Sequence, residues 1–235
     1  MSRYMLVNRV IAITGGFGTL GRAVAEACLE AGAAVVLIDH APVPSPPAAN
    51  TIQMGGVDLR MPEAAEAAFK SVIAQMGRLD GLVNVAGGFR WETVEEGSIC
   101  TWDSLYQLNL RTTVVTSKAA LPHLLSRSED GGKRIVSISA AAASKAAEGM
   151  GAYAASKAGV MKFTEALSAE VKDRLVTVNA VLPSIIDTPV NRRDMPDADA
   201  TRWVQPRAVA DLVAFLLSDR AASITGASIP IMGRM

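Results

Sequence analysis

The alternation of two kinds of segment limits this chain to one class of fold. Short apolar runs rich in β-branched residues alternate with stretches that have helical spacing. The predicted strands are residues 10–14, 34–38, 51–54, 81–85, 134–139, 175–182 and 228–232. The predicted helices are residues 19–31, 62–76, 101–127, 151–171 and 206–217. Such alternation predicts an α/β fold, a doubly wound seven-stranded parallel sheet with helices on both faces.

A cluster of prolines interrupts this alternation once. Four of the 11 prolines lie in residues 41–50, and proline removes a backbone donor and restricts its neighbour. The segment has the composition of a domain linker, but the alternation resumes directly after it. We therefore interpret it as a surface loop and expect residues 1–235 to form a single domain.

Composition excludes several functional classes. Half of the 235 residues are hydrophobic, which is enough for a buried core. Lys and Arg number 23 and Asp and Glu also 23, so we expect no nucleic-acid or anionic-membrane partner. Cys28 and Cys100 are too few for a disulfide framework. With no long apolar segment or leader, a cytoplasmic location is expected.

A glycine-rich turn follows the first predicted strand and opens the first predicted helix. Residues 14–21 read TGGFGTLG. Glycines permit a tight turn and a close approach of phosphate to the helix N-terminus, where N–H groups and the helix dipole hold an anion. The turn, here called the glycine turn, also fits a strand–helix connection without a ligand. We expect Thr19 to cap the helix.

Asp39 favours a dinucleotide at this turn. It ends the second predicted strand, where the carboxylate would accept hydrogen bonds from the adenosine ribose and repel a 2′-phosphate. No Arg or Lys occurs in residues 15–21 or 39–50, so we expect NAD(H) in preference to NADP(H). Asp58, after the third strand, is equally an adenine contact or an ordinary solvated carboxylate.

Tyr153 and Lys157 lie one helical turn apart, at i and i+4, on one face of a predicted helix. A nearby ammonium lowers the pKa of a phenol from its usual value of about 10, which prepares it to exchange a proton with a substrate oxygen. Spacing alone fits a solvated pair equally well. The glycine turn earlier in the chain favours the catalytic interpretation.

These motifs together resemble the short-chain dehydrogenase/reductase family, with a Rossmann fold, from about residue 8 onward. Further matching pieces are Asp58-Leu59, the segment 84–87 (NVAG), Asn109 in LNLRTT, and the segment 179–183 (NAVLP) leading to Thr188. The resemblance implies hydride transfer between a nicotinamide and a carbonyl or alcohol, with Tyr153 as general acid/base, Lys157 on the nicotinamide ribose and Asn109 holding a relay water.

The resemblance also implies a set of cofactor contacts. Pro183, Ile186 and Thr188 would position the nicotinamide carboxamide, and Asn84, Ala86 and Gly87 would line the adenosine side. The full expected set of cofactor-binding residues is Gly15, Phe17, Gly18, Thr19, Leu20, Gly21, Asp39, Asp58, Leu59, Asn84, Ala86, Gly87, Tyr153, Lys157, Pro183, Ile186 and Thr188. A small-molecule substrate and a homodimer or homotetramer are the expected partners.

The sequence departs from the family pattern at one important position. The family's catalytic serine lies 13 residues before the tyrosine, and here that residue is Ala140. Ser139 should point to the opposite face of the strand, and Ser144 lies farther along the loop. Lesser departures are Thr19 in place of a glycine and Ser184 after Pro183. An oxyanion-type donor contributes roughly 3 kcal/mol to a barrier, so a less demanding substrate is implied.

Some relatives lack that serine. The chain resembles the quinonoid dihydropteridine reductase branch in residues 85–88 (VAGG), in the alanine-rich segment before Gly149, and in parts of residues 187–203. Reduction of a quinonoid substrate is therefore an alternative activity. A non-catalytic dinucleotide sensor is a further alternative, motivated by Ala140.

The remaining candidates are weaker. Residues 184–205 lie where this family carries a substrate lid, in which Met195, Pro196 and Trp203 are equally pocket-lining or packing residues. For Phe89 and Trp91, core packing is expected rather than a position at the pocket mouth. The two histidines, His40 and His123, have no ligands at metal-binding spacing, so no metal site is expected.

Overall fold

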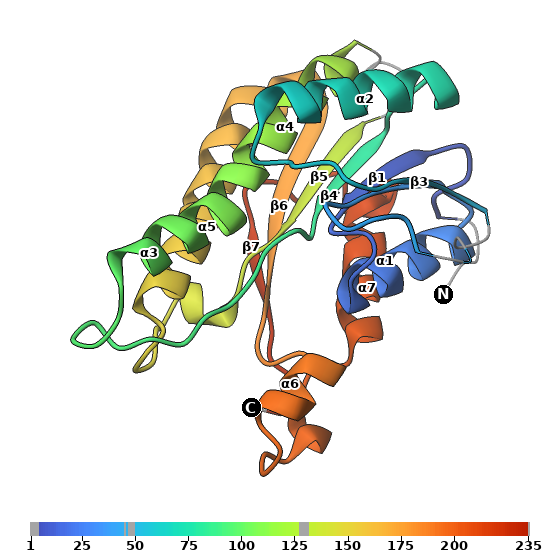
Figure 1. The fold of residues 1–235 in the computed structure, drawn as a ribbon. Coiled ribbons are helices and arrows are strands. Elements are labelled where there is room, and N and C mark those ends of the chain that lie inside the picture. Colours follow the sequence, from blue (N-terminus) through green and yellow to red (C-terminus); the bar gives the residue numbers. More distant parts are fainter. Residues whose placement is uncertain (1–4, 45, 47–49, 127–131, 235) are drawn as a thin grey trace.

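A computed structural model describes residues 5–44, 46, 50–126 and 132–234. In this part of the chain the strands form one parallel sheet in the order β3-β2-β1-β4-β5-β6-β7 (Figure 1). The strands are β1 (Val10–Thr14), β2 (Ala34–Ile38), β3 (Thr51–Met54), β4 (Gly81–Asn84), β5 (Lys133–Ile138), β6 (Val176–Pro183) and β7 (Ser228–Ile231). The predicted α/β fold is confirmed, with strand ends shifted by at most one residue.

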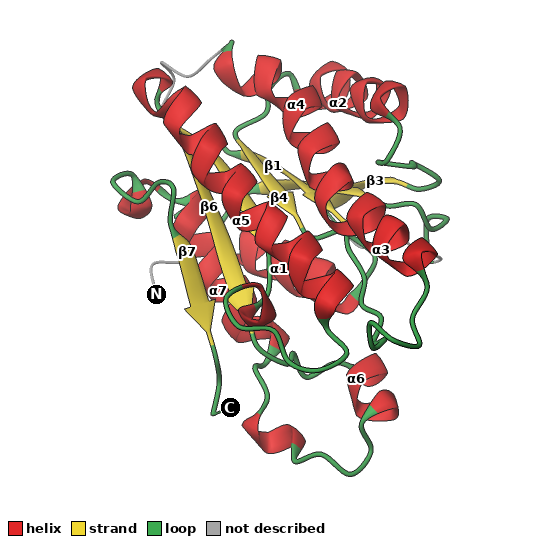
Figure 2. Ribbon diagram, turned by 90° about the vertical axis from the view of Figure 1, so that its left-hand side faces the viewer, coloured by secondary structure: helices red, strands yellow, loops and turns green. Residues whose placement is uncertain are grey.

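Helices cover both faces of the sheet, as the two ribbon views show (Figures 1 and 2). On one face, α1 and α7 pack against each other; on the other lie α2, α4 and α5. Each face has its own hydrophobic core, since the strands direct alternate side chains to opposite faces. The bounds are α1 (Thr19–Glu30), α2 (Pro62–Met76), α3 (Ile99–Leu105), α4 (Thr112–Leu125), α5 (Gly151–Val171), α6 (Pro189–Asp194) and α7 (Pro206–Leu217).

The strand order reverses between β1 and β4. From β1 the chain builds the sheet outward through β2 and β3, then returns to place β4 on the other side of β1. Connections diverge at such a switch point and leave a crevice outside the carboxyl ends of the strands. The glycine turn after β1 and the loop after β4 therefore meet at this crevice.

The long helical stretch predicted at residues 101–127 runs from Ile99 to Leu125 without a break, but its middle is π-helical. It consists of α3, a π-helical segment at Tyr106–Arg111 (η1) and α4, and residue 127 lies outside the described residues. Pro122 lies within the last turn of α4 and does not end it. Such π segments insert an extra residue into a helix and are frequent at functional sites. Asn109 lies in this segment.

Prolines keep the β2–β3 connection irregular, as predicted. Among the described residues of 39–50 the structure contains no helix. No helix in the described part of the chain is both long and apolar enough to cross a bilayer.

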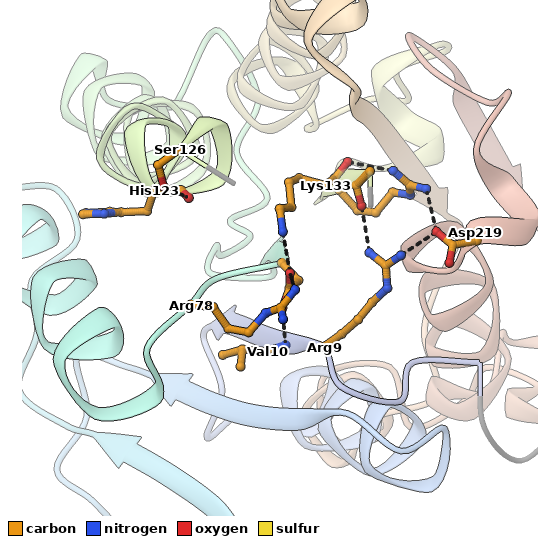
Figure 3. A network of polar contacts seen from close by, with 10 residues as sticks. Arg9, Val10, Arg78, His123, Ser126, Lys133 and Asp219 are labelled. Carbon is orange, nitrogen blue, oxygen red and sulfur yellow. Dashed lines mark hydrogen bonds and ion pairs between the residues drawn. The ribbon is translucent and has the colours of Figure 1, made fainter. Parts of the chain in front are cut away.

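A cluster of buried charges lies at the amino ends of the central strands, opposite the crevice (Figure 3). Asp80, just before β4, accepts hydrogen bonds from the Lys133 ammonium at 2.6 Å, from Nε and Nη2 of Arg78 at 2.7 Å each and from the Val10 amide at 2.9 Å. Nearby, the Arg9 guanidinium donates to Asp219. These contacts tie the starts of β1, β4 and β5 together.

The segment after β6 projects from the body of the molecule and carries α6 (Figures 1 and 2). Thr188 caps α6 by accepting a hydrogen bond from the Asn191 amide at 3.1 Å. The end of the described chain holds this segment: Arg202 donates twice to the Arg234 carbonyl, at 2.9 and 3.1 Å, and Arg234 donates to the Thr201 carbonyl at 2.7 Å. We call these reciprocal contacts the arginine clasp.

Candidate active site

A cavity of about 620 Å³ lies at the crevice. Ten of the predicted cofactor-binding residues line it: Gly15, Phe17, Gly18, Leu20, Gly21, Asp39, Asp58, Leu59, Ala86 and Gly87. His40, Arg60, Leu108 and Thr112 complete the walls together with Ala41, Val57 and Val85. The other seven, Thr19, Asn84, Tyr153, Lys157, Pro183, Ile186 and Thr188, are not among its lining residues.

The glycine turn has its shape because side chains do not fit in it. Gly15 has a φ of +63°, and a Cβ there would lie 2.9 Å from the backbone of Ala86. A Cβ on Gly21 would overlap the Gly15 carbonyl. Gly18 is different, because a Cβ there would meet only the Gly15 carbonyl, at 3.5 Å. The turn thus brings its backbone close to β4 and leaves open space at Gly18.

The helix cap differs from the prediction. Gly18 is the N-cap residue of α1, and no side chain caps the helix. Thr19 is already the first helical residue, so the expectation that it caps the helix is wrong. The N–H groups in the first turn of a helix have no carbonyl acceptor within that helix. In α1 this turn lies beside the cavity.

Asp39 lies next to the glycine turn. Its carboxylate accepts hydrogen bonds from the amides of Phe17 at 2.9 Å and Ala41 at 3.0 Å. The two bonds fix the carboxylate between the glycine turn and the loop after β2.

Asp58 is paired and is not an ordinary solvated carboxylate. Arg60 donates to it from two guanidinium nitrogens at 2.8 Å, and this hydrogen bonding lowers the pKa of Asp58 to about 2. Arg60 is a cation outside residues 15–21 and 39–50, the segments expected to carry none near the cofactor. It lines the same cavity as Asp39, but its charge is engaged by Asp58.

Contrary to expectation, the Asn84 side chain does not line the adenosine side of the cavity. Its side chain is buried beneath the cavity, where its amide donates to Ser117 at 3.1 Å and Ser137 at 3.2 Å and accepts from Thr116 at 2.6 Å. These three hydrogen bonds join the end of β4 to α4 and β5. Asn84, at a strand end where a ligand contact was predicted, therefore stabilises the packing of the fold instead.

Asn109 anchors the loop that follows β4. Its oxygen accepts from the Gly88 amide at 2.8 Å, and its nitrogen donates to the Gly88 carbonyl and to the Ser156 hydroxyl, both at 3.0 Å. The side chain is fully buried. These bonds connect η1, the β4 loop and α5, while the role of Asn109 in holding a water stays a prediction.

Tyr153 and Lys157 lie on α5 beside this loop. Burial raises the pKa of Tyr153 to about 12 and lowers the pKa of Lys157 to about 8. The expected lowering of the Tyr153 pKa is therefore not found in this chain. The Lys157 ammonium donates to the Ile138 carbonyl at 2.8 Å, and the desolvation of the phenol outweighs any attraction from it. A Cβ on Gly87 would lie 3.2 Å from the Lys157 ammonium, which connects this pair to the cavity.

Ser139 does not replace the missing serine. Its hydroxyl donates to the Lys157 carbonyl at 2.8 Å and is buried. Ala140, which is 5% exposed, begins a single turn of 3-10 helix at Ala141–Ala143 (η3) that packs on α5. Ser144 follows this turn and is exposed. Methyl groups therefore occupy the segment in which the family has its hydroxyl donor.

Phe89 was missed as a site residue. Its ring contacts that of Tyr153 edge to face, with centroids 4.9 Å apart and planes at 88°. Phe89 and Trp91 are each 55% exposed, so the core packing expected for them is wrong. The signal was its place in the sequence, directly after the loop residues that line the cavity.

The residues after β6 are held within their own segment. Ile186 bridges to Val204, and Thr188 caps α6. Asp187 pairs with Arg192. Trp203 is 5% exposed and packs the segment from inside.

Comparison with known proteins places the chain. A family model described as short chain dehydrogenase matches residues 9–199. The chain is 33% identical to 2-(S)-hydroxypropyl-CoM dehydrogenase 3 of Xanthobacter autotrophicus, over 98% of this chain and 97% of that protein. It is 34% identical to the D-threitol dehydrogenase of Mycolicibacterium smegmatis, over 98% of this chain and 94% of that protein.

A solved structure agrees with these relatives. The carveol dehydrogenase of Mycobacterium avium in complex with NAD is 27% identical, has a TM-score of 0.85 and covers 98% of each chain. With the cavity at the switch point and Tyr153 and Lys157 beside it, these likenesses show that the chain belongs to the short-chain dehydrogenase/reductase family of oxidoreductases.

Proposed function

We propose that the chain is an NAD(H)-dependent oxidoreductase that transfers a hydride between nicotinamide and a small carbonyl or alcohol substrate. One observation carries the proposal. A single cavity extends from the glycine turn past Asp39 to Gly87, and Gly87 lies against Lys157, one helical turn from Tyr153. The residues expected to bind the cofactor and those expected to transfer the proton are therefore neighbours in the fold.

The cavity fits the cofactor at its pyrophosphate end. The glycine turn leaves open space at Gly18, and the first turn of α1, which no side chain caps, lies beside this space and lines the cavity. No basic side chain is needed there, because backbone N–H groups and the helix dipole hold the charge.

Asp39 supports a preference for NAD(H). Its carboxylate is fixed beside the turn, where it would accept hydrogen bonds from ribose hydroxyls and repel a 2′-phosphate. The neighbouring cation, Arg60, is paired with Asp58. The carveol dehydrogenase structure, in complex with NAD, is in line with this choice.

Proton transfer falls to Tyr153. With a pKa of about 12 the phenol is protonated at neutral pH, so in the reductive direction it donates its proton to the carbonyl oxygen. A bound nicotinamide would supply the hydride to the carbonyl carbon. The Lys157 ammonium, whose pKa is about 8, would hold the ribose and stabilise the tyrosinate left behind. Asn109 fixes the Gly88 backbone beside them.

The cofactor preference is tested by titrating the protein with NADH and NADPH and following nicotinamide fluorescence. We expect wild type to bind NADH at least roughly tenfold more tightly, and Asp39→Asn to reduce that ratio. Asp103→Asn, an exposed change on α3, is the control. Preferential NADPH binding by wild type would overturn the argument from Asp39.

The catalytic assignment is tested with Tyr153→Phe, after a screen of ketones, secondary alcohols and quinonoid pterins for a substrate. Turnover should fall by at least about 10³-fold while NADH binding stays nearly unchanged. Tyr106→Phe removes an equivalent hydroxyl from an exposed position on η1 and serves as the control. Undiminished turnover of Tyr153→Phe would refute the role of Tyr153.

Ala140 supports a second candidate. Because η3 presents alanines where a hydroxyl donor is usual, a substrate that accepts a hydride readily suits the site better. Reduction of a quinonoid ring is such a reaction, and the pterins in the screen test for it. Binding of NADH without turnover of any class would favour a dinucleotide sensor.

We also propose that the chain forms a homodimer or homotetramer through α4 and α5. The support is the family resemblance. Sedimentation equilibrium tests it, and a monomer at micromolar concentration would contradict it.

A further inference from the structure

Phe89 is an aromatic residue that is both half-exposed and fixed in place. On its amino side, Gly88 is held by two hydrogen bonds to Asn109, at 2.8 and 3.0 Å. On its carboxyl side, Trp91 donates from its indole nitrogen to the Glu148 carbonyl at 3.0 Å. Phe89 therefore lies on a short segment anchored at both ends.

A second pair of contacts locks the same loop onto the start of α5. The Glu92 amide donates to the Gly149 carbonyl at 2.9 Å. Gly149 has a φ of +70°, and a Cβ there would overlap the indole ring of Trp91. The loop with Phe89 and the turn before Tyr153 thus form one rigid unit.

Within this unit, the ring of Phe89 meets the ring of Tyr153 at 4.9 Å. Phe89 keeps 55% of its surface exposed although an aromatic ring gains from burial. An exposed, preorganised ring beside a reactive phenol is a surface on which part of a substrate can pack.

The short η3 segment, which packs on α5, is also apolar. Its three alanines, Ala141–Ala143, are partly exposed and carry only methyl groups. A sugar or polyol requires several side-chain hydrogen-bond partners, which methyl groups cannot provide. An aromatic ring requires only apolar contact and a partner ring.

We infer that Phe89 is a specificity-determining residue that selects substrates whose reacting oxygen is attached to, or directly beside, a planar aromatic or conjugated ring. The substrate ring packs on the exposed part of Phe89 while its oxygen reaches the hydroxyl of Tyr153. This inference rests on the proposed function, because it takes Tyr153 as the proton donor.

The test compares 2-naphthol with 2-decalol, which has the same two-ring skeleton but is saturated. Binding is measured by calorimetry with and without saturating NADH, so that no turnover is needed. Wild type should bind 2-naphthol about fivefold more tightly than Phe89→Leu does, and 2-decalol should differ between the two by less than about twofold. Phe89→Tyr, which keeps the ring, should retain the wild-type affinity.

Ile99→Ala removes an exposed apolar side chain from neighbouring α3 and serves as the matched control. Equal losses for both probes, no loss for either, or no binding of 2-naphthol to wild type would overturn the inference. Oxidation of 1-(2-naphthyl)ethanol, a secondary alcohol directly beside an aromatic ring, with NAD⁺ reports the proposed function separately. Ring-selective binding without any oxidation would refute the hydride-transfer proposal and leave Phe89 as the determinant of a binding site.

Discussion

Neutralising Asp80 should destabilise the fold far more than neutralising a surface acid. Asp80 and Lys133 are each 1% exposed, whereas the side chain of Arg78 is 29% exposed. When Asp80→Asn removes the negative charge, Arg78 can be hydrated but the Lys133 ammonium cannot. Leaving one buried charge uncompensated costs about 3–5 kcal/mol, and since only one of two cations is stranded we expect about 3 kcal/mol.

Urea unfolding followed by circular dichroism measures this loss, and the melting temperature should fall by about 6–12 °C for a chain of this size. Glu165→Gln, which breaks the exposed pair with Lys162 on α5, should cost less than about 0.5 kcal/mol and is the control. Adding Lys133→Met to Asp80→Asn should restore part of the stability, because the stranded charge is removed. Equal costs for Asp80→Asn and Glu165→Gln would refute the reasoning.

The same pair predicts a dependence on pH. Burial raises the pKa of Asp80, but hydrogen bonds from Arg78 and Lys133 outweigh it and hold that pKa below its usual value. A depressed carboxyl pKa stabilises the fold above the unfolded value of about 4, and this contribution is lost as the pH falls through the folded value. The stability of Asp80→Asn should therefore fall less steeply with acid than that of wild type.

Three further substitutions test local geometry. Leu175→Gly should raise the free energy of unfolding by about 0.5–1 kcal/mol, measured in urea, because Leu175 has a φ of +57° and is 60% exposed. Gly149→Ala should lower the melting temperature and change the tryptophan fluorescence, since its Cβ would overlap Trp91; unchanged spectra would contradict this. Ala140→Ser should raise kcat/KM for a secondary alcohol by at least about tenfold, since Ser139 cannot supply the missing donor; an unchanged rate would show that no donor is needed there.

The sheet was predictable because most of its strands have a strong local signal; β3 (TIQM), which is only partly buried, has a weak one. Fully buried parallel strands such as β1 and β5 read as apolar runs, and turn residues mark their ends. The π-helical segment at 106–111 has no such signal. Its register depends on Asn109 reaching Gly88 and Ser156, residues distant in the sequence.

The candidate site was predictable at its backbone-defined parts and less so at its side chains. The glycine turn and Asp39 follow from strand ends and conformational rules. Asn84 was expected at the cofactor but is buried among hydroxyl groups. Phe89 was expected in the core but is exposed beside Tyr153. The environment of each side chain depends on how α4, α5 and the β4 loop pack together. Local sequence patterns do not predict this packing.

The arginine clasp has a practical consequence for handling the protein. Any residues fused after position 235 begin next to Arg234, whose carbonyl and guanidinium are both engaged with residues 201–202. An affinity tag joined there would therefore start against the segment that carries α6 and compete for its contacts. Measurements on such a preparation would then reflect a disturbed α6 segment. Placing the tag at the other end of the chain, or removing it by proteolysis before assay, avoids this artefact.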